Sequence, residues 1–155
     1  MQVFERWRPN ADLPQGILHS DLFRDNVLFD QGKLSGILDF SEWGRDIRLL
    51  DCAVAINDFC SEWPAVGLNP QKFSAFCEGY QNLLPWTAEE NTALPAALAV
   101  AAARFWLSRL AIQLAIQVDS QPNNQHVSSD QNPETILRKD PEEMRAMVVS
   151  RLAGH

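Results

Sequence analysis

The fold of this chain is decided by His19-Ser20-Asp21-Leu22-Phe23-Arg24-Asp25-Asn26, followed by Val27-Leu28-Phe29 and then by Gly36-Ile37-Leu38-Asp39-Phe40. The stretch offers a carboxylate at Asp21, an amide at Asn26 and a second carboxylate at Asp39. Two apolar runs flank the turn sequence Asp30-Gln31-Gly32-Lys33, a pattern that predicts a β-hairpin. Because a hairpin folds the ends of the polar loop together, we expect the three side chains to converge on one point.

This set of groups suits phosphoryl transfer from ATP. The acceptor hydroxyl must be oriented and must lose its proton, and the phosphate charge must be neutralised by Mg²⁺, which prefers oxygen ligands. Each residue alone also has a plain structural explanation. Asp21 could cap a helix, Asn26 could belong to an Asx turn, Asp39 could be a solvated strand end and His19 could be a packed histidine. The ordered combination favours the chemical interpretation over these alternatives.

The pattern H-x-D-x-x-x-x-N, followed by an apolar pair and D-F, resembles the catalytic and metal-binding loops of aminoglycoside phosphotransferases and choline kinases. It is also similar to the H-R-D and D-F-G loops of protein kinases. The resemblance implies Asp21 as catalytic base, Asn26 and Asp39 as Mg²⁺ and ATP-binding ligands, and His19 as a residue that orients the loop. It further implies that Asp51 is structural and hydrogen-bonds the catalytic loop from a helix start.

Within this superfamily the chain most resembles bacterial homoserine kinases of the phosphotransferase type. The matching stretches cover most of residues 14 to 141; they are 14–30, 34–40, 55–60, 104–110 and 139–141. The resemblance implies an α+β, mainly α fold, the C-terminal lobe of a protein-kinase-like enzyme with a small β-hairpin platform. It implies ATP-dependent phosphorylation of L-homoserine. The alternatives are an aminoglycoside, choline or sugar acceptor, or a non-catalytic kinase fragment that acts as a binding module. A cytoplasmic location is expected on other grounds: the cysteines lack C-x-x-C spacing and the N-terminal residues lack a signal-peptide pattern.

The N-terminal nucleotide-binding lobe has no counterpart in these residues. There is no Gly-rich strand turn, and Lys33, Lys72 and Lys139 all lie outside a V-A-I-K-like setting. We therefore interpret 1–15 as a lead-in segment and 16–155 as a C-lobe, and we expect the chain alone to be inactive. An N-lobe polypeptide or self-association would cover the remaining apolar surface.

Two further residues are candidates for contact with the acceptor. Arg104 stands with Arg109 on an otherwise apolar helix, and its guanidinium could bind an amino-acid carboxylate. Asp46 follows the metal aspartate, where an acceptor could lie. For the arginines we favour a plainer alternative, an internal ion pair, because buried arginines are usually paired with acids. The candidate partners are Asp51, Asp58 and Glu62.

The rest of the chain predicts helices, over about 46–59, 69–84, 87–94, 95–118 and from 140 onward. Asn69-Pro70 is an N-cap signal and Thr87 with Glu90 fits a capping box, while Pro95 is expected to end one helix and start the next. The inward faces are expected to hold Leu49, Leu50, Ala53, Ile56 and Phe59 in the first helix, and Met144, Met147, Val148 and Leu152 in the last. Residues 119–135 are polar without periodicity and are expected to form a mobile loop.

The amino-acid composition makes some classes of binding partner less favourable than others. The net charge is −7, and 46% of the 155 residues are hydrophobic, enough for one core. An acidic chain disfavours nucleic acid and anionic membranes, since both require a basic face. The apolar run from 96 to 118 contains two arginines and is interpreted as a core helix rather than a membrane span. Three cysteines without C-x-x-C spacing predict partly buried thiols in a reducing compartment.

Overall fold

The computed structural model describes residues 13–62, 64–119 and 141–154. Helices make up most of these residues, and the strands form three two-stranded antiparallel sheets. The elements are β1 (Gln15–Leu18), η1 (Arg24–Asn26), β2 (Val27–Asp30), β3 (Lys33–Ile37), β4 (Gly44–Ile47), α2 (Arg48–Phe59), β5 (Ser61–Glu62), β6 (Gly67–Leu68), α3 (Pro70–Leu83), α4 (Ala88–Asp119) and α6 (Pro141–Leu152). This is the mainly α fold with small β elements that the sequence predicts.

Strand β4 was not expected: the predicted helix begins at Asp46, so it includes the second half of the strand, and 44–45 have no predicted element. Gln15 pairs with Ile47 and Leu18 with Gly44, so 44–47 form a strand against β1. Helix α2 therefore begins at Arg48 rather than at Asp46. The pairing gives backbone N–H and C=O groups of both strands their hydrogen-bond partners. Because the two strands are distant in sequence, a local hydrophobic periodicity does not reveal this stabilisation.

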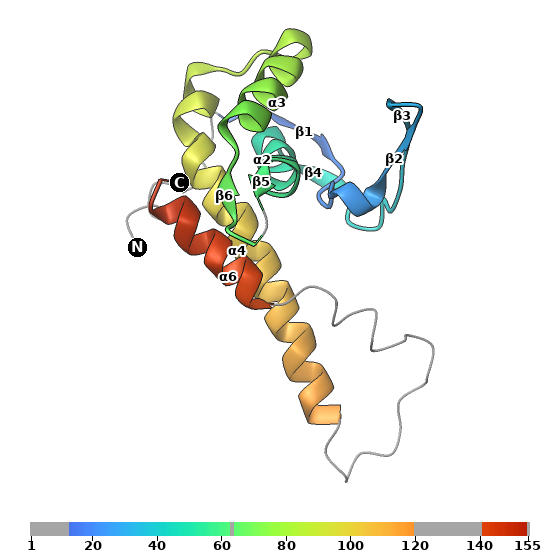
Figure 1. Cartoon of the computed structure of the whole chain (residues 1–155), viewed down its shortest axis with the longest axis vertical. Helices are drawn as coiled ribbons and strands as arrows, with labels where there is room; N and C mark the ends of the chain where they lie inside the picture. The colour runs from blue at the N-terminus through green and yellow to red at the C-terminus, as the bar shows by residue number, and fades with distance from the viewer. Residues whose placement is uncertain (1–12, 63, 120–140, 155) are drawn as a thin grey trace.

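Strands β2 and β3 form the predicted hairpin. Gln31 and Gly32 have φ angles of 47° and 76°, the left-handed values that a tight two-residue turn requires. The returning strand covers Lys33–Ile37, shorter than the expected 34–40, and its register shifts between Leu28 and Phe29. Figure 1 shows the hairpin projecting away from the helices.

Helix α2 lies at the centre of the molecule, where most of its residues are buried. Leu49, Ala53 and Ile56 are inaccessible to solvent, as predicted, whereas Leu50 and Phe59 are partly buried at the edge of the core. Helices α3 and α4 pack around α2 with mixed aliphatic and aromatic side chains, among them Phe73, Phe76, Leu94, Leu98 and Phe105. The core therefore surrounds the helix that follows β4.

Both predicted helix starts are confirmed. The Asn69 side chain accepts hydrogen bonds from the amides of Gln71 and Lys72, and Pro70 follows at the first helical position. Thr87 N donates to Glu90 Oε2 at 2.8 Å, and Glu90 N donates to Thr87 Oγ1 at 3.1 Å. This reciprocal pair is a capping box.

The expected break at Pro95 is wrong, because α4 runs through it as one helix. Proline removes one helical hydrogen bond, to the carbonyl of Asn91. Asn91 and Pro95 both lie on the exposed face, so water can satisfy that carbonyl. Buried Leu94 and Ala97 on either side hold the helix against the core.

By length and composition alone, α4 over Ala88–Ala115 could cross a membrane, the one such helix among the residues described. Core helices pass the same test, and only 28% of its most apolar window is buried. Ala97, Leu98 and Ala101 on this helix do pack into the core.

Helix α6 packs along α4, and Met144, Met147 and Val148 face inward as predicted. Leu152 is 39% exposed, so its predicted inward position is wrong; the guanidinium of Arg151 is buried there instead. The expected Asp140 cap, the 1–12 part of the lead-in and positions 120–135 of the expected loop lie outside the described residues.

Arg151 is buried, and its guanidinium hydrogen-bonds to Asn57 on α2 and to two residues that follow that helix. Its guanidinium donates to Asn57 Oδ1 at 2.9 Å, to the Val66 carbonyl at 2.9 Å and to Ser61 Oγ at 2.7 Å. Burial lowers the pKa of Arg151 to about 10, and it remains charged at neutral pH. Asn57 in turn donates to the Leu98 carbonyl at 2.8 Å. The network ties α6 to α2 and α4.

Candidate active site

The loop between β1 and η1 is held at its start by a carboxylate from α2. Asp51 accepts hydrogen bonds from the amides of His19, at 2.8 Å, and Ser20, at 2.7 Å. The expectation that Asp51 fixes this loop from a helix start is therefore confirmed. Ser20 has a φ of 70°, a left-handed value that is unfavourable for a residue with a side chain. Arg104 Nη1 donates to the Ser20 carbonyl at 3.0 Å. The amide and the carbonyl of this strained residue are therefore both held by hydrogen bonds.

His19 links the loop to the end of the hairpin. Its Nδ1 accepts from the Asp21 amide at 3.3 Å, and its Nε2 lies 2.7 Å from the Leu38 carbonyl. The two contacts assign the proton to Nε2, since a carbonyl can only accept. The ring also packs on Phe40, with centroids 4.7 Å apart. These contacts suit the orienting role that the sequence predicts for His19.

Asp21 and Asn26 lie in direct contact. Asn26 Nδ2 donates to the Asp21 carbonyl at 2.8 Å and to its carboxylate Oδ2 at 3.1 Å. The amide group thus uses its nitrogen toward Asp21 and directs its oxygen elsewhere. Between them, Phe23 is buried and packs edge-on against Phe105, with centroids 4.6 Å apart.

Asp39 reaches the same region through the hairpin. Leu38 N donates to the Asn26 carbonyl at 2.8 Å, which brings the residue before Asp39 against Asn26. Asp39 itself has a φ of 57°, a second strained position. Its Oδ1 accepts from the amide and hydroxyl of Ser41, and these bonds lower the pKa of Asp39, an exposed carboxyl. Asp39 is therefore ionised at neutral pH.

The side-chain oxygens of Asn26 and Asp39 are of the chemical type that binds a small divalent cation. An amide oxygen of Asn26 and a carboxylate oxygen of Asp39 are both hard ligands of the type that Mg²⁺ prefers. Within 13–62, 64–119 and 141–154, no group of three or more His, Cys, Asp and Glu side chains is placed to hold a metal. A site built from one amide and one carboxylate would need phosphate and water oxygens to complete it.

A second carboxylate on α2, that of Asp58, holds the far end of the loop, a role that the sequence analysis did not assign to it. Asp58 Oδ2 accepts from the Arg24 amide at 2.7 Å and from Arg24 Nε at 3.1 Å. The spacing from Asp51 is the signal that could have revealed it, because residues seven apart share a helix face.

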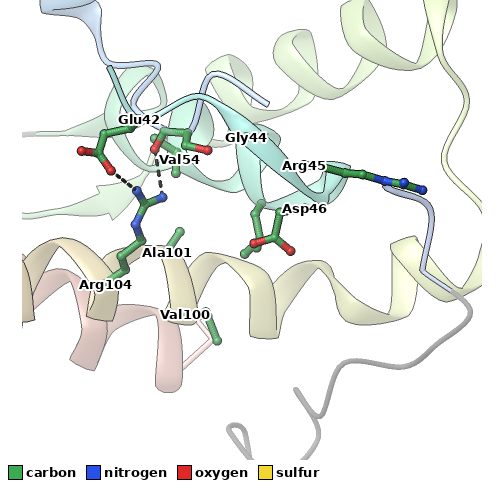
Figure 2. Close-up of a pocket in the computed structure, with 10 residues that line it drawn as sticks. Glu42, Gly44, Arg45, Asp46, Val54, Val100, Ala101 and Arg104 are labelled. Atoms are coloured by element: carbon green, nitrogen blue, oxygen red, sulfur yellow. Dashed lines mark hydrogen bonds and ion pairs between the residues drawn. The ribbon is translucent and has the colours of Figure 1, made fainter. Parts of the chain in front are cut away.

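Beside the loop lies a pocket of about 280 Å³ that contains both candidate acceptor residues. Arg104 and Asp46 face it from α4 and β4 (Figure 2). The other residues that line it are Ser20, Glu42, Gly44, Arg45, Leu50, Val54, Val100 and Ala101. The pocket thus combines two acids with two arginines, of which Glu42 and Arg45 were not singled out from the sequence.

The favoured alternative for Arg104 needs correction. Arg104 Nη2 lies 3.6 Å from Glu42 Oε2, and both side chains are about half exposed. The three acids proposed as partners have other contacts: Asp51 and Asp58 bind the loop, and Glu62 accepts from Asn69. Glu42 was not foreseen because it comes from the loop before β4.

Comparison with known proteins shows the family of this chain. Residues 1–86 match the family model described as "Phosphotransferase enzyme family". The chain is 46% identical over 107 residues to a homoserine kinase from Methylobacillus flagellatus, and the match covers 69% of this chain and 33% of that protein. Homoserine kinases from Polaromonas naphthalenivorans and Pseudomonas aeruginosa are each 46% identical over 98 residues, 63% of this chain and 31% of theirs. The chain spans about a third of the length of these relatives. It belongs to the phosphotransferase enzyme family.

Proposed function

We propose that this chain supplies the catalytic and metal-binding loops of an ATP-dependent kinase that phosphorylates the hydroxyl of L-homoserine. One observation carries the proposal: Asn26 hydrogen-bonds the Asp21 carboxylate, while the Leu38–Asn26 backbone bond brings Asp39 to the same loop. A proton acceptor and two oxygen ligands then lie together, as transfer of a phosphoryl group to an alcohol requires.

In this proposal Asp21 orients the acceptor hydroxyl and takes its proton as the oxygen attacks the γ-phosphorus of ATP, whose bond to the bridging oxygen breaks so that ADP leaves. The contact from Asn26 Nδ2 fixes the direction of the carboxylate, so the acceptor meets a preorganised group. His19 holds the Asp21 amide on one side and the hairpin on the other.

Asn26 and Asp39 would hold Mg²⁺ through their side-chain oxygens. The ion neutralises phosphate charge when bound. The Ser41 amide and hydroxyl both donate to Oδ1 of Asp39 and lower the pKa of its carboxyl, which favours the ionised form that a metal ligand needs. One carboxylate and one neutral amide would bind the nucleotide-bound metal without neutralising it completely.

The pocket that contains Arg104 and Asp46 is the proposed acceptor site. Homoserine is a zwitterion, with a carboxylate and an ammonium group in addition to its hydroxyl. Arg104 suits the carboxylate and Asp46 suits the ammonium, and both signs of charge line the pocket. Arg104 also donates to the carbonyl of Ser20, the residue before Asp21, so a carboxylate bound there would lie close to the base. A uniformly acidic pocket would instead favour a cationic acceptor such as choline or an aminoglycoside.

The groups that cover the ATP phosphates would come from a polypeptide outside these 155 residues. We propose that such an N-lobe, or a second copy of the chain, packs on the apolar surface around the hairpin. That surface holds eight large exposed side chains: Ile17, Leu28, Phe29, Leu34, Ile37, Leu38, Phe40 and Trp43. We place the reaction in the cytoplasm, where ATP is available and the three free thiols stay reduced.

The test is a chimaera in which this whole chain is joined to the part of the Polaromonas naphthalenivorans relative that lies outside their 98-residue match. ADP formation with Mg-ATP is measured with L-homoserine, choline, an aminoglycoside and a hexose. We expect L-homoserine to be preferred. Substitution of Arg104 by Lys or Ala should raise KM for homoserine, since lysine lacks the planar fork that pairs with a carboxylate.

The outcomes separate the parts of the proposal. Transfer to choline or the aminoglycoside, with none to homoserine, contradicts the acceptor but keeps the kinase chemistry. A folded chimaera that transfers phosphate to no acceptor in the panel contradicts both. An unchanged homoserine KM in both Arg104 variants removes that residue from the site.

A further inference from the structure

The loop that carries Asp21 and Asn26 is bonded at both ends to one face of α2. Asp51 accepts the amides of His19 and Ser20, before Asp21. Asp58 accepts the amide of Arg24, two residues before Asn26. Residues 51 and 58 lie two helical turns apart, so their side chains point the same way.

Arg24 and Asp58 interact through a side-chain ion pair and through a backbone hydrogen bond, which differ in strength. The side-chain ion pair, 3.1 Å between Nε and Oδ2, involves an arginine that is 48% exposed, and solvent weakens such pairs. The backbone part is shorter, 2.7 Å from the Arg24 amide to Oδ2, and the Asp58 side chain is only 12% exposed. The hydrogen bond from the Arg24 backbone amide should therefore contribute more to the contact than the side-chain ion pair, since a hydrogen bond to a partly buried charge is among the strongest.

The amide of Arg24 is the first of the short 3-10 helix η1, whose last residue is Asn26. No side-chain hydrogen bond caps η1 at Phe23. The carboxylate of Asp58 therefore binds an N-terminal amide of the turn that sets the direction of the Asn26 side chain.

We infer that Asp58 is a positioning residue: it fixes η1 and thereby the contact between the Asn26 side chain and Asp21, while Asp51 fixes the other end of the loop. The inference rests on the proposed function for its catalytic meaning. Asp51 then governs the geometry of the proton acceptor, and Asp58 that of the amide oxygen offered to the metal.

The test compares four variants of the 155-residue chain by NMR: Asp58→Ala, Asp58→Asn, Arg24→Ala and Asp51→Ala. Arg24→Ala is the matched control, because it removes the guanidinium and keeps the amide that donates to Asp58. Backbone hydrogen exchange is followed at residues 19, 20, 24 and 26. The side-chain amide signals of Asn26 report its contact with Asp21.

We expect Asp58→Ala to speed exchange of the Arg24 amide by about 10- to 100-fold, the effect of losing one hydrogen bond to a charge. The Asn26 side-chain signals should shift toward those of a free amide, while the amides of His19 and Ser20 stay protected. Asp51→Ala should show the reverse pattern. Asp58→Asn, which keeps an acceptor oxygen, should restore part of the protection, and Arg24→Ala should resemble the parent chain.

A purely structural role of Asp58 would lower protection throughout the chain without a selective shift of the Asn26 side chain. That result, or an Arg24→Ala effect as large as that of Asp58→Ala, overturns the inference. If Asp58→Ala does not fold, the Asp58→Asn pattern decides by the same criterion.

Line broadening by Mn²⁺ separates this inference from the proposed function. With ATP present, whose phosphate oxygens complete the site, we expect broadening at Asn26 and Asp39 in the parent chain, and weaker Mn²⁺ binding by about tenfold or more in Asp58→Ala. Absence of broadening in the parent chain contradicts the proposed metal ligands, whereas the exchange pattern alone decides whether Asp58 positions Asn26.

Discussion

Asn26 Nδ2 lies 3.1 Å from Oδ2 of Asp21 and 2.8 Å from the carbonyl oxygen of the same residue. One side-chain amide thus ties together the backbone and the carboxylate of the proposed base. The arrangement separates two tasks on neighbouring groups, because the nitrogen of Asn26 orients Asp21 while its oxygen is directed elsewhere.

Replacement of Asp21 by Asn in the chimaera should lower kcat by about 10²- to 10⁴-fold, the contribution of a general base. ATP affinity should change far less, because Asn26 and Asp39 are the proposed ligands of the metal-nucleotide. Steady-state kinetics with varied ATP and homoserine measure both. Asp30→Asn, in the exposed hairpin turn, is the control for a lost carboxylate. Unchanged turnover in Asp21→Asn removes that residue from its role.

The 155 residues assayed alone should fold but transfer phosphate to homoserine at no useful rate. The core around α2 forms within the chain. Phosphoryl transfer depends on groups that position and cover the phosphates, and none of Lys33, Lys72 and Lys139 stands in a sequence typical of that task. Circular dichroism and a phosphohomoserine assay check both halves of this prediction. Robust product formation by the purified chain would show that one lobe suffices.

Glu90 should contribute strongly to stability. It is inaccessible to solvent and accepts two hydrogen bonds of 2.6 Å from the Arg48 guanidinium. Glu90→Ala leaves a mostly buried arginine without its partner and should cost about 3–5 kcal/mol of unfolding free energy. Urea denaturation measures the loss. Glu78→Ala, an exposed acid on α3, should change stability by less than about 0.5 kcal/mol.

The same residue predicts a pH dependence. Burial alone would raise the pKa of Glu90, but hydrogen bonds from Arg48 and the Thr87 amide lower it below its ordinary value of 4.5. A lowered pKa in the folded state means that the stabilisation is present above about pH 4.5 and is lost as the pH falls through the folded-state pKa. The difference in Tm between the parent chain and Glu90→Gln should therefore shrink from pH 7 to pH 3. A constant difference would contradict this assignment.

The exposed hairpin should drive self-association of the isolated chain. Phe29 and Leu34 pair across β2 and β3 and are 62% and 57% exposed. Replacing both by Thr keeps strand propensity and removes apolar surface, so it should shift the chain toward monomer in light scattering. Leu83→Thr, at an 88% exposed position on α3, is the control. If the Leu83 variant dissociates as readily as the hairpin variant, the hairpin is not the interface.

Signals confined to a few neighbouring residues were predicted well from the sequence. The Asn69 cap, the Thr87–Glu90 capping box and the 30–33 turn each depend on side chains that bond their own backbone neighbours. The approach of Asp21 to Asn26 was expected from the predicted hairpin, whereas the role of Asp51 followed from a family resemblance.

Features that depend on distant residues were missed. Strand β4 exists because β1 lies beside it, and Pro95 stays helical because Leu94 and Ala97 are packed. Arg104 pairs with Glu42 across a separation that no periodicity encodes. Helical periodicity places Asp58 on the same face as Asp51, but the hydrogen bond from the Arg24 amide depends on how the loop packs against α2. Such pairings are decided by tertiary packing, which overrides local preference.

The spacing of Asp51 and Asp58 on α2 limits where residues can be inserted into this chain or deleted from it. Insertion of a single residue between them would rotate one carboxylate by about 100° around the helix axis relative to the other. One end of the 19–26 loop would then lose its hydrogen-bond acceptor even though Asp21 and Asn26 were still present. Insertions and deletions should therefore be far less tolerated within these two helical turns than in the turn of the hairpin, which can lengthen without moving Asp21 away from Asn26.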